Sequence, residues 1–245
     1  MIEVRRYGSV GPPVIVLHGG PGAPGYMAPV ARALADEMVV LEPLQRASGG
    51  EPLTVARHVA DLDEVVRSLG GDVRPALVGS SWGGMLALAY AAAHPDATRA
   101  IVVVGSGTFD PVARARMHEL IAERRSQRRD AYIFAAADDE GDDDELPFDR
   151  AANQQTWDDM LRLQAAGVYP AAFAAIRVPV VMLHGTYDPH PGEMIRDALL
   201  PFIPHLEYVQ WDHCGHYPWR ERHARAAFFS TVHAFLARHS SPPSP

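Results

Sequence analysis

The sequence predicts an α/β protein: a mostly parallel central sheet with helices on both faces and a short helical cap. Short apolar runs bounded by turn residues recur along the chain, which is typical of strands buried on both faces. Segments of helical character alternate with these runs, as expected where helices join parallel strands. The alternation breaks once, in a stretch that has no convincing strand and is too long for a simple connection. That stretch predicts the cap.

The apolar runs predict the strands in chain order. They are Val14–Leu17, Met38–Leu41, Ala76–Val78, Ile101–Val104, Val180–Leu183 and Leu206–Val209. Helical segments between and after these runs supply the covering layers. They are Met27–Asp36, Thr54–Leu69, Gly84–His94, Pro191–Leu200 and Arg222–Arg238. We therefore assign residues 1–106 and 177–245 to one core domain.

Residues 107–176 form the predicted cap, which we expect to lie over one end of the sheet. Pro111–Arg129 and Asn153–Ala166 have helical character. The acidic segment DDEGDDDELPFD between them is typical of a solvated loop.

Composition and charge restrict the classes of function. Apolar residues make up 47% of the 245 residues, and the chain has no run of ~18 or more apolar residues that would predict a membrane span. The net charge of −8 argues against nucleic-acid binding, which needs a basic face. No apolar leader follows the charged start, and a single cysteine, Cys214, excludes an internal disulfide. We expect a cytoplasmic globular protein that binds neither nucleic acid nor membrane, with its oligomeric state left open.

A serine pair among glycines is the strongest chemical signal. Gly79-Ser80-Ser81-Trp82-Gly83 fits the pattern G-x-S-x-G between a predicted strand and a predicted helix, the context of a nucleophile elbow. The turn is tight, so the residues two positions before and after the nucleophile must be small. Gly79 and Gly83 meet that need around Ser81, whereas Val78 and Trp82 would crowd Ser80. Ser81 is therefore the predicted nucleophile, and the helix after it favours a developing anion.

Backbone amides for an oxyanion hole are expected in the glycine-rich turn that follows the first predicted strand. We predict the N–H groups of Gly20 and Trp82, with Gly19 as the alternative to Gly20. His18, in the same turn, is expected to support the loop.

A general base is expected late in the chain, in the segment Trp211-Asp-His-Cys-Gly-His-Tyr217. His216 is preferred to His213, because it follows a glycine and precedes the final helix, so that its loop can turn back to the elbow. The group His213, Cys214 and His216 could also suggest a metal site, but it lacks an evident fourth ligand. We predict no metal and no cofactor.

The acid that orients the base is expected after the strand at Val180–Leu183. Asp188 lies a few residues past that strand end and would hold the imidazole tautomer. Asp110 is the alternative, and Asp212 is too close in sequence to His216 to be preferred.

Together these segments resemble the α/β-hydrolase superfamily over nearly the whole chain, and within it the proline iminopeptidase-like branch. The resemblance rests on HGGPG at 18–22, GSSWGG at 79–84, LALAY at 86–90, His94-Pro95, Gly185-x-x-Asp188 and Gly215-His216. It implies the α/β-hydrolase fold and cofactor-free hydrolysis through an acyl-enzyme. In that chemistry Ser81 attacks, His216 carries the proton and Asp188 orients the histidine.

The chain departs from that branch in ways that bear on its substrate. The branch usually has Asp-Gln-Arg-Gly where this chain has Leu44-Gln-Arg-Ala47, and the N-terminal hairpin is reduced to Glu3–Arg6. The cap is short, and no single amine-binding glutamate can be assigned in the acidic run 138–145. These departures favour a serine hydrolase of small carboxylic esters over an iminopeptidase-like aminopeptidase that cleaves amides. A non-catalytic ligand-binding protein on the same fold is the third hypothesis.

Aromatic residues are expected to line the substrate pocket under the cap. The preferred candidates for substrate contact are Trp82, Phe109, Trp157 and Trp219. Further candidates are Tyr132, Phe134, Tyr169 and Phe173.

Overall fold

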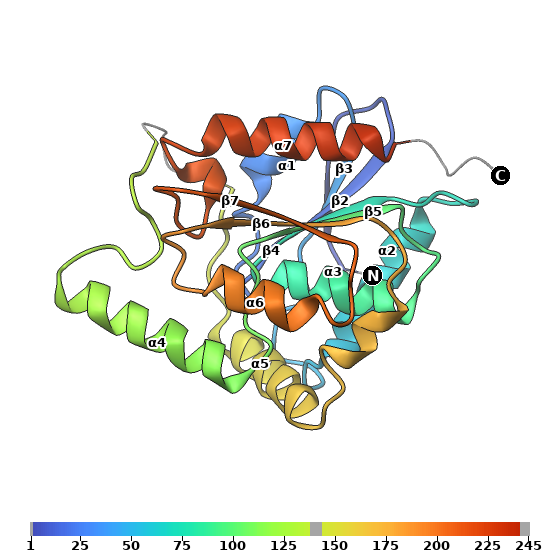
Figure 1. Cartoon of the computed structure of the whole chain (residues 1–245). Helices are drawn as coiled ribbons and strands as arrows, with labels where there is room; N and C mark the ends of the chain where they lie inside the picture. The colour runs from blue at the N-terminus through green and yellow to red at the C-terminus, as the bar shows by residue number, and fades with distance from the viewer. Residues whose placement is uncertain (1, 138–143, 241–245) are drawn as a thin grey trace.

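The computed structural model describes residues 2–137 and 144–240, and a seven-stranded sheet forms its centre (Figure 1). The strands lie in the order β1-β3-β2-β4-β5-β6-β7. Their bounds are β1 (Val4–Tyr7), β2 (Pro13–Leu17), β3 (Val39–Pro43), β4 (Ala76–Ser80), β5 (Ala100–Val104), β6 (Val180–Gly185) and β7 (Leu206–Trp211). Only the edge strand β1 pairs antiparallel, and every other pairing is parallel. The predicted mostly parallel sheet is confirmed.

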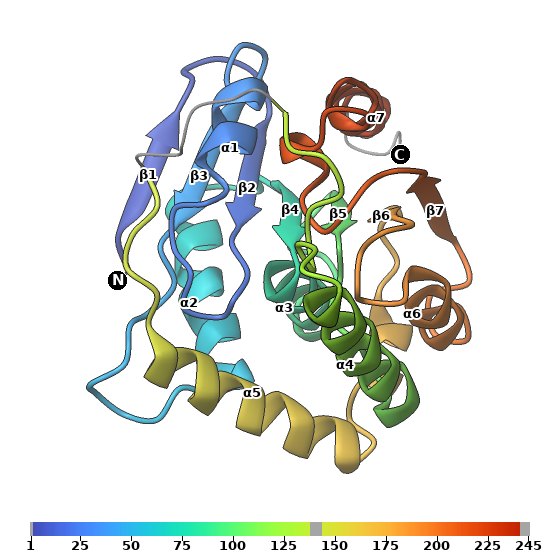
Figure 2. The same cartoon turned by 90° about the vertical axis from the view of Figure 1, so that its left-hand side faces the viewer.

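Helices cover both faces of the sheet, as the sequence predicts (Figures 1 and 2). One face carries α1 (Ala28–Leu34) and α7 (Arg225–Arg238). The other carries α2 (Val55–Ser68), α3 (Trp82–Ala93) and α6 (Gly192–Leu199). The central strands are apolar on both sides because each face packs against its own helices: Ile101 and Val103 belong to the α3 side, and Val102 and Val104 to the α7 side. No helix within the described residues is long and apolar enough to cross a membrane.

The segment predicted as a cap contains α4 (Pro111–Ser126), α5 (Arg150–Ala165) and the short 3₁₀ helix η1 (Ala171–Ala175). Helices α4 and α5 lie outside the two layers that cover the sheet (Figures 1 and 2). The described part of the segment contains no strand. The acidic loop predicted at 138–149 falls partly on 138–143, outside the described residues. The domain boundaries at 107 and 176 stay a prediction.

Polar contacts attach α5 to the core. Gln155 Oε1 accepts from the backbone N–H of Leu53 at 3.0 Å, and Asp159 Oδ2 accepts from the backbone N–H of Val55 at 2.8 Å. Val55 is the first residue of α2, so this carboxylate satisfies an N–H that has no partner inside the helix. The N-terminus of α2 is therefore completed by a side chain from the predicted cap.

A buried histidine lies at the same contact between α2 and α5. His58 on α2 is hydrogen-bonded through Nε2 to Thr156 Oγ1 of α5 at 2.9 Å, and both side chains are buried. Burial lowers the pKa of His58 from 6.5 to about 4. His58 is therefore neutral in the folded protein at neutral pH.

The lowered pKa of His58 predicts that acid reduces the stability of the folded protein. Between pH 6.5 and pH 4 the unfolded chain binds a proton at His58 that the folded chain does not bind. The contribution of neutral His58 to the free energy of unfolding is therefore fully present above this window and is lost as the pH falls through it. The contribution lost between pH 7 and pH 5 is about 2 kcal/mol. In urea unfolding, the loss of stability over that interval should be smaller by about this amount in His58→Gln than in the wild type. Equal losses would contradict the assignment.

Candidate active site

Ser81 occupies a strained turn between β4 and α3. Its backbone has φ 54° and ψ −120°, a conformation that non-glycine residues rarely adopt. Small neighbours make the turn possible: a Cβ at position 79 would lie 2.2 Å from the carbonyl oxygen of Gly83, and one at position 83 would lie 2.2 Å from that of Leu17. The turn therefore needs small residues two positions before and after Ser81, as the G-x-S-x-G pattern predicts.

The two serines of the pair have different surroundings. Ser81 is half-buried and lines a cavity of about 590 Å³. Ser80 is fully buried at the end of β4, and its hydroxyl has no hydrogen-bond partner among the described residues. Only Ser81 is placed to meet a ligand.

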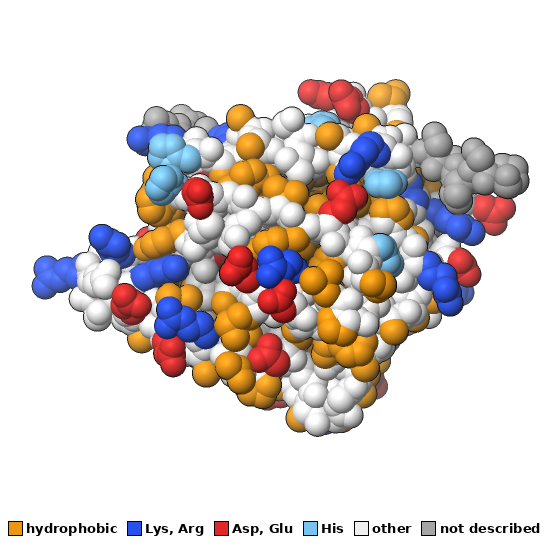
Figure 3. Space-filling view, viewed as in Figure 1, with side chains coloured by type: hydrophobic (Ala, Val, Ile, Leu, Met, Phe, Trp, Pro, Cys, Tyr) orange, Lys and Arg blue, Asp and Glu red, His pale blue; other side chains and the backbone are white. Residues whose placement is uncertain are grey.

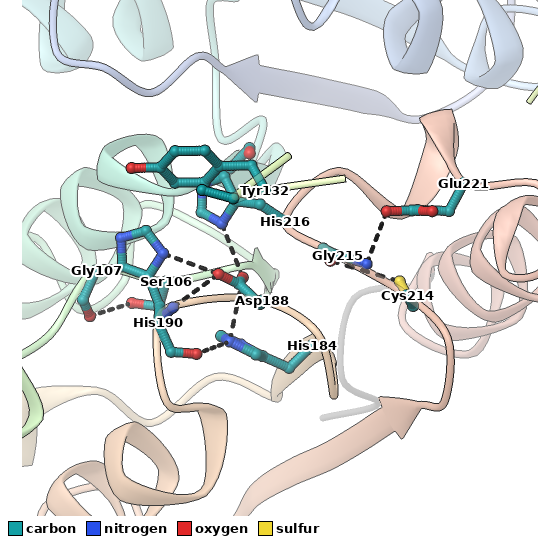
Figure 4. Close-up of polar contacts among 12 residues, drawn as sticks. Ser106, Gly107, Tyr132, His184, Asp188, His190, Cys214, Gly215, His216 and Glu221 are labelled. Atoms are coloured by element: carbon teal, nitrogen blue, oxygen red, sulfur yellow. Dashed lines mark hydrogen bonds and ion pairs between the residues drawn. The ribbon is translucent and has the colours of Figure 1, made fainter. Parts of the chain in front are cut away.

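His216 and Asp188 form a buried pair beside this cavity. Asp188 follows β6, His216 follows β7, and His216 Nδ1 lies 2.7 Å from Asp188 Oδ2 (Figure 4). The end of β5 lies against this pair at Gly105, which has φ 53° and where a Cβ would be 2.9 Å from His216 Nδ1. His216 lines the cavity together with Ser81. The structure thus brings the three predicted residues to one end of the sheet.

Asp188 is enclosed by two further histidines that the sequence analysis did not identify (Figure 4). Its Oδ1 accepts from the backbone N–H of His190 and lies 2.9 Å from His190 Nδ1. The ring of His190 stacks on that of His216, with centroids 4.6 Å apart. His184 Nε2 lies 3.2 Å from Asp188 Oδ2 and 2.9 Å from the carbonyl oxygen of His190. The Asp-x-His spacing is a usable signal, because an aspartate often accepts the N–H two residues on.

These neighbours set the charge of the group. Burial raises the pKa of Asp188, but the neighbouring histidines, His216 foremost, outweigh burial and hold that pKa well below its ordinary value. Burial lowers the pKa of both His184 and His190. Asp188 is therefore an ionised carboxylate surrounded by ring N–H donors. Asp188, His190 and His216 also offer possible metal-ligand atoms within 4.8 Å of one another, but the observed N···O contacts of 2.7 and 2.9 Å are those of hydrogen bonds.

The alternative residues lie elsewhere. His213 is exposed and contacts the ring of Phe134 with centroids 5.0 Å apart. Asp110 caps α4, where its Oδ1 accepts from two backbone N–H groups at 2.9 Å. His18 is buried and supports its loop, since its Nε2 lies 3.0 Å from the backbone nitrogen of Gln45 and burial lowers its pKa to about 4. None of the three lines the cavity.

One glycine of the turn after β2 lines the cavity. Gly20 has φ 102° and lines the cavity. The N–H of Gly19 instead donates to the hydroxyl of Tyr26 at 2.8 Å. Trp82 is the first residue of α3, so its N–H has no partner within the helix.

The predicted substrate contacts divide into two groups. Trp157 and Tyr132 line the cavity. Trp82, Phe109 and Trp219 are 0%, 4% and 2% exposed, lie in the packed core and do not line it. Their assignment as side-chain contacts is corrected to core packing: Trp82 Nε1 donates to Gln45 Oε1 at 2.8 Å, Phe109 packs on Phe173 and Trp219 stacks on Tyr26. Sequence composition does not distinguish a ring in a pocket wall from one behind it.

Glu221 joins the predicted cap to the loop of His216. This carboxylate is fully buried and accepts three backbone N–H groups at 2.8 Å, from Phe134, Ala135 and Gly215. Figure 4 shows the last of these contacts. The N–H of His216 itself donates to the carbonyl oxygen of Tyr132 at 2.7 Å. Glu221 therefore fixes the peptide that precedes His216. Sequence analysis missed it, because a buried glutamate that binds only backbone leaves no motif.

A family model described as "Alpha/beta hydrolase family" matches residues 14–229. The chain belongs to the alpha/beta hydrolase family. The match covers the elbow and the segments of Asp188 and His216, and it confirms the fold class and the superfamily inferred from the motifs.

Similar curated proteins include several proline iminopeptidases, which confirms the resemblance to that branch. The chain is 29% identical over 201 residues to the proline iminopeptidase of Neisseria gonorrhoeae, covering 69% of this chain and 61% of that protein. It is 29% identical over 107 residues to the cis-3-alkyl-4-alkyloxetan-2-one decarboxylase of Shewanella oneidensis, covering 40% of this chain and 34% of that protein. The alignments thus span between about a third and three fifths of these relatives.

Solved structures share the fold across almost the whole chain. E-2-(acetamidomethylene)succinate hydrolase has a TM-score of 0.72 at 19% identity, covering 96% of this chain and 95% of that one. An esterase from Thermogutta terrifontis has a TM-score of 0.71 at 18% identity, covering 98% and 94%. Family membership and these relatives support the prediction of a hydrolase.

The contacts of Glu221 predict that Glu221→Gln is destabilising. The new amide nitrogen would face a backbone N–H, so that at least one buried donor loses its acceptor, at a cost of about 1–3 kcal/mol. Urea unfolding should show this loss, and hydrolysis should slow because the loop of His216 is less well fixed. Glu207→Gln is the matched control, since Glu207 lies on β7 in an exposed ion pair with Arg238. Similar stability of the two variants would show that the hydrogen bonds of Glu221 do not stabilise the fold.

Proposed function

We propose that the protein is a cofactor-free serine hydrolase that cleaves small carboxylic esters through an acyl-enzyme intermediate. One observation carries the proposal: a serine on a strained strand-to-helix turn shares a cavity wall with a histidine that is hydrogen-bonded to a buried carboxylate. The family and the hydrolases among the similar proteins support it.

In this mechanism Ser81 Oγ attacks the carbonyl carbon of the ester, and its proton passes to Nε2 of His216. Asp188 holds the Nδ1–H and stabilises the imidazolium that forms. The tetrahedral intermediate then expels the alcohol, which takes the proton from His216. Water repeats the sequence on the acyl-enzyme: His216 accepts its proton and returns one to Ser81 as the acid leaves.

The negative oxygen of the tetrahedral intermediate needs donors that are already in place. We assign the N–H groups of Gly20 and Trp82. The hydrogen bond from Gly19 to Tyr26 favours Gly20, because it occupies the neighbouring amide. Burial raises the pKa of Tyr26 to about 12, so that this hydroxyl stays protonated. Helix α3 begins at Trp82 and adds its positive end to the same place.

The aminopeptidase alternative requires a carboxylate that binds the free amino group of the substrate. Among the described residues, Glu145 is the only carboxylate that lines the cavity, and it forms an ion pair with Arg220. An acid that is already neutralised is a poor partner for an ammonium group. This pairing favours esters over aminoacyl amides.

The mechanism predicts that Ser81→Ala abolishes covalent labelling by a fluorophosphonate. Its kcat/KM for p-nitrophenyl butyrate should fall by about 10³-fold or more, because nucleophile and base act as a unit. Ser80→Ala is the control, since its buried hydroxyl has no partner to lose. Persistent labelling of Ser81→Ala would exclude the serine mechanism. An unlabelled and inactive wild type would favour the non-catalytic hypothesis.

The charge of the cavity predicts which substrates are preferred. The kcat/KM for p-nitrophenyl butyrate should exceed that for proline p-nitroanilide by at least about 100-fold, because no unpaired carboxylate among the described residues lines the cavity to recognise the amine. Acetylating the proline nitrogen should not reduce the residual rate. If acetylation abolishes fast turnover of the proline substrate, the protein is an aminopeptidase.

A further inference from the structure

One wall of the cavity carries an arginine that has no carboxylate partner among the described residues. Arg114 extends from α4, is half-buried and lines the cavity that contains Ser81. Its Nη2 donates to the side-chain oxygen of Gln164, and Gln164 Nε2 donates to the carbonyl oxygen of Thr108 at 2.9 Å. The guanidinium is thus oriented by a neutral amide, which fixes its position and leaves its charge intact.

Neighbouring arginines contrast with Arg114. Arg116 on the same helix pairs with Glu119 at 3.0 Å, and Arg220 on the cavity wall pairs with Glu145. No carboxylate lies within ion-pair distance of Arg114 among the described residues. Arginine side chains gather over α4 in the space-filling view, where acidic side chains lie among them (Figure 3). On the part of the cavity wall that the structure describes, the fixed charge that remains unpaired is therefore positive.

A second side chain on this wall can form a hydrogen bond with an anion. His118 lies one helical turn after Arg114 and also lines the cavity. The protein as a whole has a net charge of −8, which repels anions in general. A local cation in the cavity offsets that repulsion for a ligand bound there, and a guanidinium presents two parallel N–H groups that match the two oxygens of a carboxylate.

We propose that Arg114 binds a carboxylate of the substrate, so that the preferred substrates are esters carrying a second, ionised carboxyl group besides the scissile ester. This inference rests on the proposed serine hydrolase function. The Gln164–Thr108 contact holds the arginine beside the strand-end loop at Gly107 and Thr108, which lines the same cavity. Arg114 thereby acts on substrate choice and leaves the bond-breaking groups unchanged.

The test compares esters of equal length with and without the charge. The p-nitrophenyl monoester of glutaric acid carries the carboxylate on the acyl side, and p-nitrophenyl pentanoate is its neutral counterpart. The butyrate ester of 4-hydroxybenzoic acid carries it on the alcohol side, and phenyl butyrate is its neutral counterpart. In the wild type, kcat/KM should be about 10- to 100-fold higher for at least one anionic ester than for its neutral partner, the discrimination expected of a charged hydrogen bond. If the preference appears only for the acyl-side or only for the alcohol-side carboxylate, it identifies which part of the substrate lies against Arg114.

Arg114→Gln should abolish that preference, chiefly by raising KM for the anionic ester. Arg114→Lys should restore part of it, because the charge remains and the paired N–H groups are lost. Arg116→Gln is the matched control and should keep the wild-type ratio. Added salt should reduce the preference in the wild type and have little effect on Arg114→Gln.

The possible outcomes distinguish the carboxylate site at Arg114 from the serine hydrolase function. If the wild type hydrolyses neutral and anionic esters with equal kcat/KM, or if Arg114→Gln keeps the wild-type ratio, the carboxylate site is refuted and the serine hydrolase stands. If the wild type hydrolyses none of these esters and Ser81 is not labelled by a fluorophosphonate, the hydrolase proposal itself fails.

Discussion

The site depends on one buried negative charge. The side chain of Asp188 is fully buried, so its ionised form persists only because hydrogen-bond donors surround it. The rings of His190 and His216 and one backbone N–H supply those donors, and they come from the segments that follow β6 and β7. A carboxylate enclosed in this way fixes the ring that faces the cavity and also holds together the loops that carry it. The surrounding donors therefore keep Asp188 ionised, and the ionised carboxylate in turn holds these donors in place.

The cavity itself is built from two parts of the chain that meet through polar contacts. Helix α5 completes the N-terminus of α2, and the segment after α4 is bound by Glu221. Such contacts are directional, so they set the position of the covering helices more exactly than apolar packing alone would. The strained backbone at Ser81 can persist because the surrounding strands and helix determine it from several sides.

Much of this could be predicted from sequence, for identifiable reasons. The strands are buried on both faces and leave continuous apolar runs, and the elbow requires glycines at fixed spacing, so both produce local patterns. The contacts that Glu221 makes with Phe134 and Ala135 produce none, since they depend on which loops the topology brings together. The aromatic residues show the same limit: Trp157 lines the cavity and Trp219 lies in the core, although both belong to segments close to the site. Burial of a single ring depends on packing geometry, which residue type does not encode.

The way Glu221 holds the segment at 134–135 has a consequence for divergence within this family. The carboxylate contacts only main-chain nitrogens there, so the identity of the side chains is irrelevant to the contact. Proline is the exception, because it has no hydrogen to offer. As far as this contact is concerned, homologues can therefore vary at these two positions while retaining the same loop, and variability there is no sign that the architecture around the histidine has decayed.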